Sequence, residues 1–574
     1  MQWTHGGSQP VQQLVLVGPH DSLTLLLAER LAASAAAGAC RVVHGPGGAY
    51  EEALAGSDGV VYRPPLAKAG RPDLADAEAL FGACRRAVEA SGRPSRLILL
   101  SSAAVHDPSH HNPGYLPEGQ RPRGTNPIAR AWRDLEDLVA SCPVAERIVL
   151  RPAPVLTRDG RDYFSRLLRG KAAFVPAGYD PALQLLSPED LAEAVCCAVE
   201  RGEGKPGVYH VAPAGAVPVR GALRLAGVRR LAVEAGLQRP VRAVASRLGW
   251  ADPGDQLDYL RHSWTVSGRK IERELGFSPR RTSAEAVLEA FGGGAPDGVP
   301  GFDDYGLDEG YIAAYGRTLF RFLHDVYWRI EHQGIENVPR QGRVVLTGVH
   351  RGFMPWDGVM ALHLLRREIG RTPRFLIHPC LIKFPFLANY MTKLGGILAC
   401  QENADWILGR DEILGMFPEG IGGAFTPYRD AYKLGKFGRD EYVKMALRSR
   451  APIVPFVTVG SAEIYPILAR IDSKFVRRVA EWPYLPITPT FPLPGLPLPS
   501  KWHTRFLEPL PVHERYPPEA AEDPEVVHEI SREVRARMAA AIQEMLGRRR
   551  SIFFGSVFGK EEGKSDEGMA KDAA

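Results

Sequence analysis

The sequence lacks several features that define whole classes of protein. Its start, MQWTHGGSQPVQQ, has no basic segment followed by an apolar run, so we expect no secretory signal peptide. No stretch approaches the roughly 18 consecutive apolar residues that mark a membrane-spanning helix, so any membrane contact is expected to be peripheral. The seven cysteines follow no metal-ligand spacing. This predicts reduced thiols in a cytosolic protein and no bound metal.

The composition is that of a globular protein. Hydrophobic residues make up 45% of the 574 residues and charged residues 24%. The chain is too long for one ordinary core, which predicts two or three domains. The net charge of +5 is too small to indicate a nucleic-acid partner, but it suits anionic lipids or phosphorylated cofactors.

One segment divides the chain. Residues 292–301, GGGAPDGVPG, are so rich in glycine and proline that they predict a linker. The predicted domains are therefore residues 12–291 and 302–550. The small, charged tail at 558–574 is expected to be disordered.

The first half alternates short apolar runs with helical segments. The runs are LVLVG (14–18), RVVHG (41–45), GVVYRP (59–64), RLILLSS (96–102), RIVLRPAPVL (147–156) and VYHVA (208–212). Continuous apolar strands separated by helices predict an α/β domain with a doubly wound parallel sheet. Such sheets bind dinucleotides at the carboxyl ends of their strands.

Three further stretches are similar to one enzyme family. LILLSSAAVHD (97–107), SPEDLAEAVCCAVE (187–200) and SWTVSGRKIERELGFSPR (263–280) resemble the extended short-chain dehydrogenase/reductases of the NAD-dependent epimerase type. The resemblance covers residues 12–291. It implies a Rossmann domain that contacts NAD(P) near Gly18 and near Ser101 or Ser102.

The chemistry of that family is missing from this half. Gly18 stands alone where the family has a GxxGxxG turn, and the second strand ends at His44-Gly45 without an acidic residue for a ribose. The family places a tyrosine and a lysine four residues apart for proton transfer. When Glu136 anchors the alignment, Trp132 takes the lysine position and Ile128 the tyrosine position. We expect a degenerate domain for which NAD(P) binding is doubtful, and which binds a nucleotide or acyl carrier or serves as a scaffold.

In the second half, a histidine and an aspartate flank a short turn. RVVLTGVH reads as a strand that ends near His350, and Pro355 suits the first turn of the next helix. Asp357 falls in that first turn, where the helix dipole favours a carboxylate. On one continuous helix the two residues would be about 10 Å apart, but across a loop-to-helix turn their side chains can meet.

Further motifs follow in order. Phe417, Pro418, Glu419 and Gly420 form FPEG after the apolar strand DEILGM, and APIVPFVTVG follows at 451–460. Together with HRGFMPWD (350–357), they resemble the glycerolipid acyltransferase family in its HxxxxPxD branch. The resemblance covers about residues 305–545 and implies an α/β acyltransferase domain.

The resemblance also implies a reaction. A fatty acyl group would pass from acyl-CoA or acyl carrier protein to a lipid hydroxyl at the inner face of a membrane, with no cofactor required. His350 would be the general base and Asp357 would orient it. The FPEG residues, Glu419 and Gly420 above all, would shape the acceptor site. The alternatives are an epimerase or reductase with a displaced catalytic pair, and a non-catalytic lipid-binding scaffold.

One position departs from the family pattern. Gln401 stands where the family has an arginine that pairs with an acceptor phosphate, and glutamine cannot neutralise a phosphate. An uncharged, diacylglycerol-like acceptor is therefore expected. A lysophospholipid acceptor stays open, with Lys433, Lys436 and Arg439 as compensating charges.

Two aromatic stretches allow two interpretations each. The segment at 310–328 is either a helix packed on its own domain or an interfacial helix at lipid headgroups. The proline-rich segment at 482–502 is either a packed apolar loop or a surface that enters a membrane.

Overall fold

The computed structural model describes residues 13–34, 39–45, 50–67, 70–159, 162–234, 254–292, 303, 305–438, 440–491 and 497–558. The chain forms two compact units. Unit 1 comprises residues 1–309 and 381–393, and unit 2 comprises 310–380 and 394–574. Nearly all of the predicted linker and tail lies outside the described residues, so their conformations stay predictions.

Unit 1 is built on a six-stranded sheet whose order is β2-β1-β3-β4-β5-β8. Every neighbouring pair is parallel. The strands are β1 (Gln13–Gly18), β2 (Ala39–His44), β3 (Gly59–Tyr62), β4 (Arg96–Leu100), β5 (Glu146–Pro152) and β8 (Gly207–Val211). They coincide with the six apolar runs of the sequence, because strands covered on both faces are apolar throughout.

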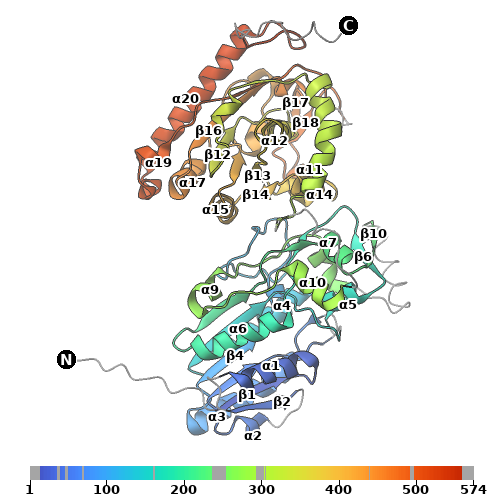
Figure 1. Cartoon of the computed structure of the whole chain (residues 1–574), viewed down its shortest axis with the longest axis vertical. Coiled ribbons are helices and arrows are strands. Elements are labelled where there is room, and N and C mark those ends of the chain that lie inside the picture. The colour runs from blue at the N-terminus through green and yellow to red at the C-terminus, as the bar shows by residue number, and fades with distance from the viewer. Residues whose placement is uncertain are drawn as a thin grey trace, which may run out of the picture. The chain divides into compact units, whose positions relative to one another are not determined.

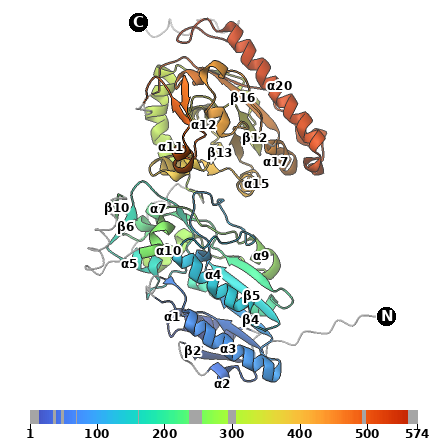
Figure 2. The same cartoon turned by 180° about the vertical axis from the view of Figure 1, so that it is seen from behind.

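Helices cover both faces of this sheet. α1 (Ser22–Ala33) and α6 (Pro188–Arg201) lie on the face toward the viewer in Figure 1, and α3 (Leu74–Ser91) and α4 (Pro127–Ala140) lie on the other, seen in Figure 2. Each face has its own hydrophobic core. The predicted doubly wound Rossmann-like domain is confirmed.

The other elements of unit 1 are shorter. They are α2 (Tyr50–Leu54), α5 (Tyr163–Arg169), β6 (Ala172–Pro176), β7 (Ala182–Leu183), β9 (Val217–Pro218), α7 (Val219–Leu225), β10 (Arg229–Val233), α9 (Arg269–Leu275), α10 (Ser283–Phe291), α14 (Leu387–Lys393) and two 3-10 helices at Ala103–Val105 and Gly254–Leu260.

Unit 2 contains a seven-stranded mixed sheet in the order β11-β19-β16-β12-β15-β13-β14. β12 lies at its centre and runs parallel to both neighbours, β15 and β16. The strands are β11 (Glu331–Gln333), β12 (Val344–Gly348), β13 (Arg374–Ile377), β14 (Ile397–Leu398), β15 (Ile413–Met416), β16 (Ile453–Val459) and β19 (His503–Phe506). The carboxyl ends of β12 and β15 therefore meet at one edge of the sheet, and the two candidate motifs follow these ends.

Unit 2 also contains helices and a hairpin. The helices include α11 (Glu309–Tyr315), π-helical turns at Gly316–Phe320 and Leu323–Tyr327, α12 (Trp356–Ile369), α15 (Gln401–Gly409), α16 (Ile421–Ala424), α17 (Glu441–Ser449), α18 (Lys474–Val479), α19 (Val512–Arg515) and α20 (Pro524–Arg548), while β17 (Ala469–Ile471) and β18 (Leu485–Ile487) pair as a hairpin. Among the described residues, none of the helices combines the length and the apolar character needed to cross a bilayer.

Candidate active site

His350 follows the central strand of unit 2, and Asp357 lies in the first turn of α12. The two side chains meet: His350 Nδ1 and Asp357 Oδ2 are 2.7 Å apart. The Asp357 side chain is fully buried, whereas that of His350 keeps 12% of its surface exposed. A proton on Nδ1 donates to the carboxylate and leaves Nε2 as the nitrogen that can accept a proton.

Asp357 is held by the backbone around it. Its Oδ2 also accepts a hydrogen bond from the Arg351 amide at 2.9 Å, and its Oδ1 accepts one from the Gly358 amide at 2.8 Å. Gly352 makes the intervening turn with φ +83°, and a Cβ there would lie 2.3 Å from the Ser461 carbonyl oxygen. The longer spacing between histidine and aspartate thus forms a tight turn, and only glycine fits at position 352 of this turn.

Phe417 stands beside the histidine. It follows β15, and its ring stacks on the His350 ring with centroids 4.9 Å apart. Phe375 stacks on it at 5.5 Å, and Phe456 contacts it edge-on at 6.0 Å. These rings hold one face of the imidazole in an apolar setting, which restricts its orientation.

The rest of FPEG forms a tight turn. The Gly420 amide donates to the Phe417 carbonyl at 2.8 Å, and Gly420 has φ +57° and ψ −149°, a conformation that side chains disfavour. Pro418 occupies the turn between them. Pro418 and Gly420 therefore position the residues on either side of them.

Glu419 has a different partner from the one expected. Its carboxylate makes a bidentate ion pair with Arg351, at 2.5 Å to Nη1 and 3.0 Å to Nη2, and both side chains are almost completely buried. Its Oε1 also accepts from the Gly435 amide at 2.5 Å. Both oxygens accept hydrogen bonds from the protein, so Glu419 secures the loop next to His350. Its predicted contact with an acceptor stays a prediction.

Arg351 is the residue that sequence reasoning missed. Besides Glu419, its guanidinium donates to the carbonyls of His350 at 2.6 Å and Lys433 at 3.0 Å, and to that of Ala431. It thereby joins the histidine turn, the FPEG turn and the segment after α16. The available signal was a charged residue directly after the base, inside an otherwise apolar stretch.

The residues considered for binding an acceptor phosphate are not gathered around His350. Gln401 begins α15 and donates to Asp405 of the same helix at 2.7 Å. Lys433 is exposed and pairs with Asp430 at 2.9 Å, and Lys436 is exposed as well. Arg439 lies outside the described residues. Among the described residues, no hydrogen bond or ion pair joins the side chains of Gln401, Lys433 or Lys436 to His350.

In unit 1, the place for a pyrophosphate is filled by the protein itself. Asp21 caps α1 by accepting from the Thr24 amide at 2.9 Å, and Arg63 pairs with this carboxylate at 2.7 and 2.9 Å. Burial raises the pKa of Asp21, but the hydrogen bonds and charge of Arg63 outweigh it and hold the pKa below its usual value. A Cβ on Gly18 would lie 3.0 Å from the Thr24 hydroxyl. The helix N-terminus that binds phosphate in dinucleotide folds already has an anion.

The two serines are also engaged. Ser101 donates to Glu136 at 2.6 Å, and Glu136 makes a bidentate pair with Arg151 at 2.8 and 2.6 Å. Ser102 caps the 3-10 helix at Ala103–Val105 through the Ala104 amide. Ile128 and Trp132 are buried in α4. The residues present do not fit NAD(P), because Gly18, Ser101 and Ser102 serve packing and capping.

We expect Asp357→Asn to lower kcat for the acyl transfer that the sequence predicts by about 100-fold or more, in the range usual for loss of acid–base function. Asparagine has one side-chain oxygen for three hydrogen bonds, and its amide group facing Nδ1 would leave the histidine proton on Nε2. Steady-state rates measure the effect. Asp411→Asn, an exposed pair with Arg343, is the matched control and should retain the wild-type rate; equal rates for both variants would contradict the role of Asp357.

The chain is similar to one protein family and to several known proteins. Residues 329–459 match the family described as Acyltransferase. An uncharacterized protein of Mycobacterium tuberculosis is 38% identical over 259 residues, which are 44% of this chain and 72% of that protein. Phytyl ester synthase 1 of Arabidopsis thaliana is 27% identical over 284 residues, 44% of this chain and 39% of that protein.

Solved structures are similar to about half of the chain. A UDP-N-acetylglucosamine 4-epimerase from Bacillus cereus matches 49% of this chain and 98% of its own at 14% identity, with a TM-score of 0.36. The human epimerase family protein SDR39U1 with NADPH matches 48% of this chain and 98% of its own at 17% identity, with a TM-score of 0.36.

Proposed function

This chain belongs to the family of the mycobacterial protein and carries an acyltransferase domain, and we propose that it moves a fatty acyl group from a thioester to a lipid hydroxyl. The observation that carries the proposal is the 2.7 Å hydrogen bond between the partly exposed His350 and the buried Asp357, at the carboxyl end of the central strand. The donor in this proposal is acyl-CoA or acyl carrier protein.

The proposed reaction needs one base and no covalent intermediate. His350 Nε2 takes the proton of the acceptor hydroxyl as its oxygen attacks the thioester carbonyl. The carbon–sulfur bond then breaks, and the leaving thiolate takes the proton back from the imidazolium. Asp357, charged and buried behind Nδ1, stabilises the imidazolium while the proton is on the ring. A thioester is already activated, so an acyl-enzyme is unnecessary.

An uncharged alcohol is the acceptor that the site favours. The buried guanidinium of Arg351, which donates to the His350 carbonyl, is already paired with Glu419. Gln401 supplies no charge, and the Lys433 ammonium pairs with Asp430. Lys436 is exposed on the surface, and none of the described side chains considered for acceptor charge is a buried, unpaired cation that could bind a phosphate group. The name of the Arabidopsis relative, an ester synthase for phytyl esters, points the same way.

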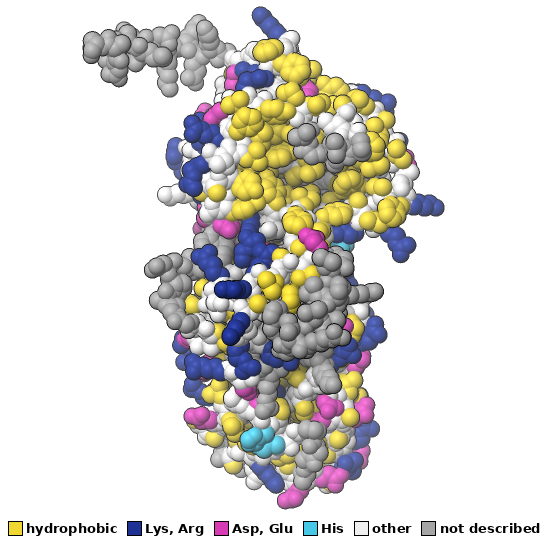
Figure 3. Space-filling view, turned by 90° about the vertical axis from the view of Figure 1, so that its right-hand side faces the viewer, with side chains coloured by type: hydrophobic (Ala, Val, Ile, Leu, Met, Phe, Trp, Pro, Cys, Tyr) yellow, Lys and Arg dark blue, Asp and Glu magenta, His cyan; other side chains and the backbone are white. Residues whose placement is uncertain are grey.

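We place the enzyme peripherally on the inner face of a membrane. Figure 3 shows a broad hydrophobic face on unit 2. The exposed large apolar side chains of unit 2 are Leu319, Phe322, Val326, Leu468, Ile471, Phe475, Val479, Phe491, Ile552, Phe553 and Phe554. Patches of this kind mark interaction sites, and the basic residues Lys474, Arg477 and Arg478 of α18 suit anionic headgroups. The seven free cysteines support a reducing compartment.

Each aromatic stretch has both buried and exposed side chains, so part of each packs on its domain, and the membrane interpretation stays a prediction. In the 310–328 segment, Phe320 and Trp328 are buried, while Phe322 is 50% exposed. In the 482–502 segment, Trp502 is fully buried and Phe491 is 48% exposed. Residues 492–496 lie outside the described part. One face of each segment packs on unit 2, and the other is available to a lipid surface.

The function is tested with purified protein, radiolabelled palmitoyl-CoA and palmitoyl-acyl carrier protein, and three acceptors. The acceptors are a long-chain alcohol, diacylglycerol and lysophosphatidate. We expect labelled ester with an uncharged acceptor at a rate well above that with lysophosphatidate. A clear preference for lysophosphatidate would overturn the acceptor class, and no ester with any acceptor would overturn the transfer itself.

Membrane binding is expected to depend on the exposed phenylalanines. Phe475 and Phe554 are 73% and 72% exposed. Each buried phenylalanine contributes roughly 1.5–3 kcal/mol, so Phe475→Glu with Phe554→Glu should weaken binding to vesicles at least about 100-fold. Co-sedimentation with phosphatidylglycerol–phosphatidylcholine vesicles measures this. Leu25→Glu, at an exposed site of α1, should bind as the wild type does. Equal binding by all three proteins would exclude the hydrophobic face as the contact.

A further inference from the structure

Unit 1 contains a cavity at the carboxyl ends of its parallel strands. Its walls include Arg63 and Pro64 after β3, Ser101 and Ser102 after β4, and Pro154 after β5. The volume is about 170 Å³. Doubly wound sheets bind their ligands in this place, so the position alone marks a binding site whose usual occupant has been excluded by the Asp21–Arg63 pair.

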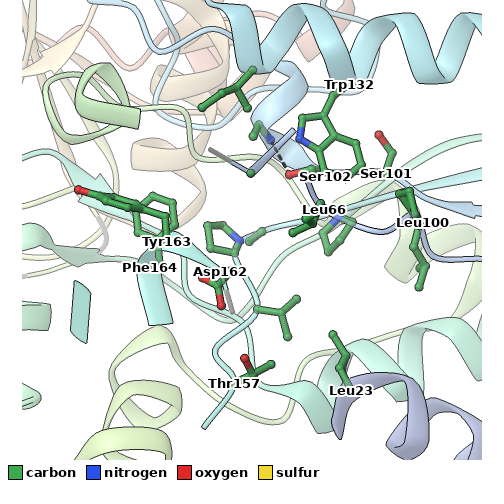
Figure 4. Close-up of a pocket in the computed structure, with 18 of the residues that line it drawn as sticks. Leu23, Leu66, Leu100, Ser101, Ser102, Trp132, Thr157, Asp162, Tyr163 and Phe164 are labelled. Atoms are coloured by element: carbon green, nitrogen blue, oxygen red, sulfur yellow. Dashed lines mark hydrogen bonds between the residues drawn. The ribbon is translucent and has the colours of Figure 1, made fainter. Parts of the chain in front are cut away.

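The walls of the cavity are mainly apolar. Its lining residues come from β4, α4, α5 and the loops after β5 and before α9, and include Leu100, Ile128, Trp132, Val155, Phe164 and Trp264. Leu100, Trp132 and Phe164 are labelled in Figure 4. Trp132 and Ile128 stand where a dehydrogenase would hold its lysine and tyrosine. An apolar cavity of about 150 Å³ can stay dry and take up a benzene-sized molecule. This cavity is therefore suited to an apolar segment and not to a nucleotide.

One polar atom in the wall lacks a hydrogen-bond partner among the described residues. Asp162 caps α5 through Oδ1, which accepts from the Ser165 amide at 2.9 Å. Its Oδ2 is buried and has no hydrogen-bond partner among the described residues. Burial raises the pKa of the Asp162 carboxyl. A buried carboxyl oxygen without a partner is unfavourable, and a ligand hydroxyl would supply the missing hydrogen bond in either protonation state.

The charges around the cavity select against an acidic ligand. The charged side chains in its wall are Asp21, Asp159, Asp162 and Arg63. Arg63 is paired with Asp21, and Asp159 accepts hydrogen bonds from Ser22 and Thr157. Among the described residues of the wall, no cation remains for a carboxylate or phosphate, and the acidic side chains would repel one. An uncharged polar end is the chemistry that fits.

We propose that this cavity binds an uncharged aliphatic alcohol, with its chain between Trp132 and Val155 and its hydroxyl at Asp162 Oδ2. The degenerate Rossmann domain is then a binding module for an apolar alcohol. This inference goes beyond the proposed acyl transfer and does not rest on it, because every residue involved belongs to unit 1.

The test is photo-crosslinking of the full-length protein with a hexanol analogue that carries a diazirine on its chain, followed by mass-spectrometric mapping. We expect labelled peptides within residues 127–169, competition by hexanol, and no competition by ionised hexanoate or by NAD+. No acyl donor is added, so the result is independent of the acyltransferase reaction. Labelling confined to residues 310–558, equal competition by hexanoate, or displacement by NAD+ would each overturn the proposal.

A pair of variants sharpens the result. Val155→Trp fills the cavity and should reduce labelling of residues 127–169 about tenfold, the loss that about 1.4 kcal/mol produces. Leu25→Trp adds the same bulk at an exposed site of α1 and should leave the labelling unchanged. Undiminished labelling of folded Val155→Trp would overturn the assignment. If circular dichroism shows that Val155→Trp is unfolded, the peptide map and the competition measured with wild-type protein test the proposal.

Discussion

Replacing His350 with glutamine is expected to lower the rate of acyl transfer by about 100- to 10,000-fold, the range for loss of a general base. Glutamine can retain a hydrogen bond to Asp357 but cannot take a proton from the acceptor hydroxyl at neutral pH. The surrounding Phe417 and Phe375 rings should keep the site packed, so the melting temperature should change little. The measurement is the initial rate of labelled ester formation at saturating substrates.

The matched control is His363→Gln, in the same helix as Asp357. His363 is buried near His324, with ring centroids 5.7 Å apart, and burial lowers its pKa to about 4. Its ring contacts are with Phe320 and His324, and it makes no hydrogen bond with His350 or Asp357. The folded variant should therefore keep a rate within a few-fold of the wild type. Comparable losses in both variants would show that the effect on His350 is structural and not catalytic.

Replacing Glu419 with glutamine is expected to reduce the free energy of unfolding of unit 2 by about 3–5 kcal/mol, because it leaves the buried Arg351 charge unpaired. The two side chains are 2% and 3% exposed and are joined by two hydrogen bonds. Urea unfolding, followed by circular dichroism, measures the change. Loss of this pair should also release the turn that carries His350.

Glu522→Gln is the control for this prediction. Glu522 pairs with Arg448 on the surface, where the side chains are 74% and 40% exposed, and such pairs contribute about 0–1 kcal/mol. If Glu419→Gln instead left stability unchanged and raised the KM for the acceptor alone, Glu419 would bind the acceptor, and its assignment to the loop would be wrong.

Local sequence patterns predicted the features that depend on residues close together in the chain. The six apolar runs of unit 1 form its parallel sheet, since strands buried on both faces need continuous apolar sequence. The contact of His350 with Asp357 was also predictable, because glycine and proline in between favour a turn before a helix. The role of each motif residue as base or acceptor contact remains a prediction.

Pairs distant in sequence were not predictable. Arg351 and Glu419 are 68 residues apart, and the buried pair of Arg549 with Glu463 spans 86 residues. No periodicity marks such partners, because they meet only when separate elements pack together. For the same reason, the missing glycines after Gly18 indicated a lost phosphate site without revealing that Asp21 and Arg63 fill it.

The central claim is that His350 activates the acceptor hydroxyl directly, without an acyl-enzyme. The most direct measurement is stopped-flow release of free thiol from palmitoyl-CoA, with and without a long-chain alcohol, in wild type and His350→Gln. The account predicts rapid thiol release only when both His350 and the alcohol are present, with one ester formed per thiol. A burst of thiol from the wild type without alcohol, or undiminished ester formation by His350→Gln, would contradict it.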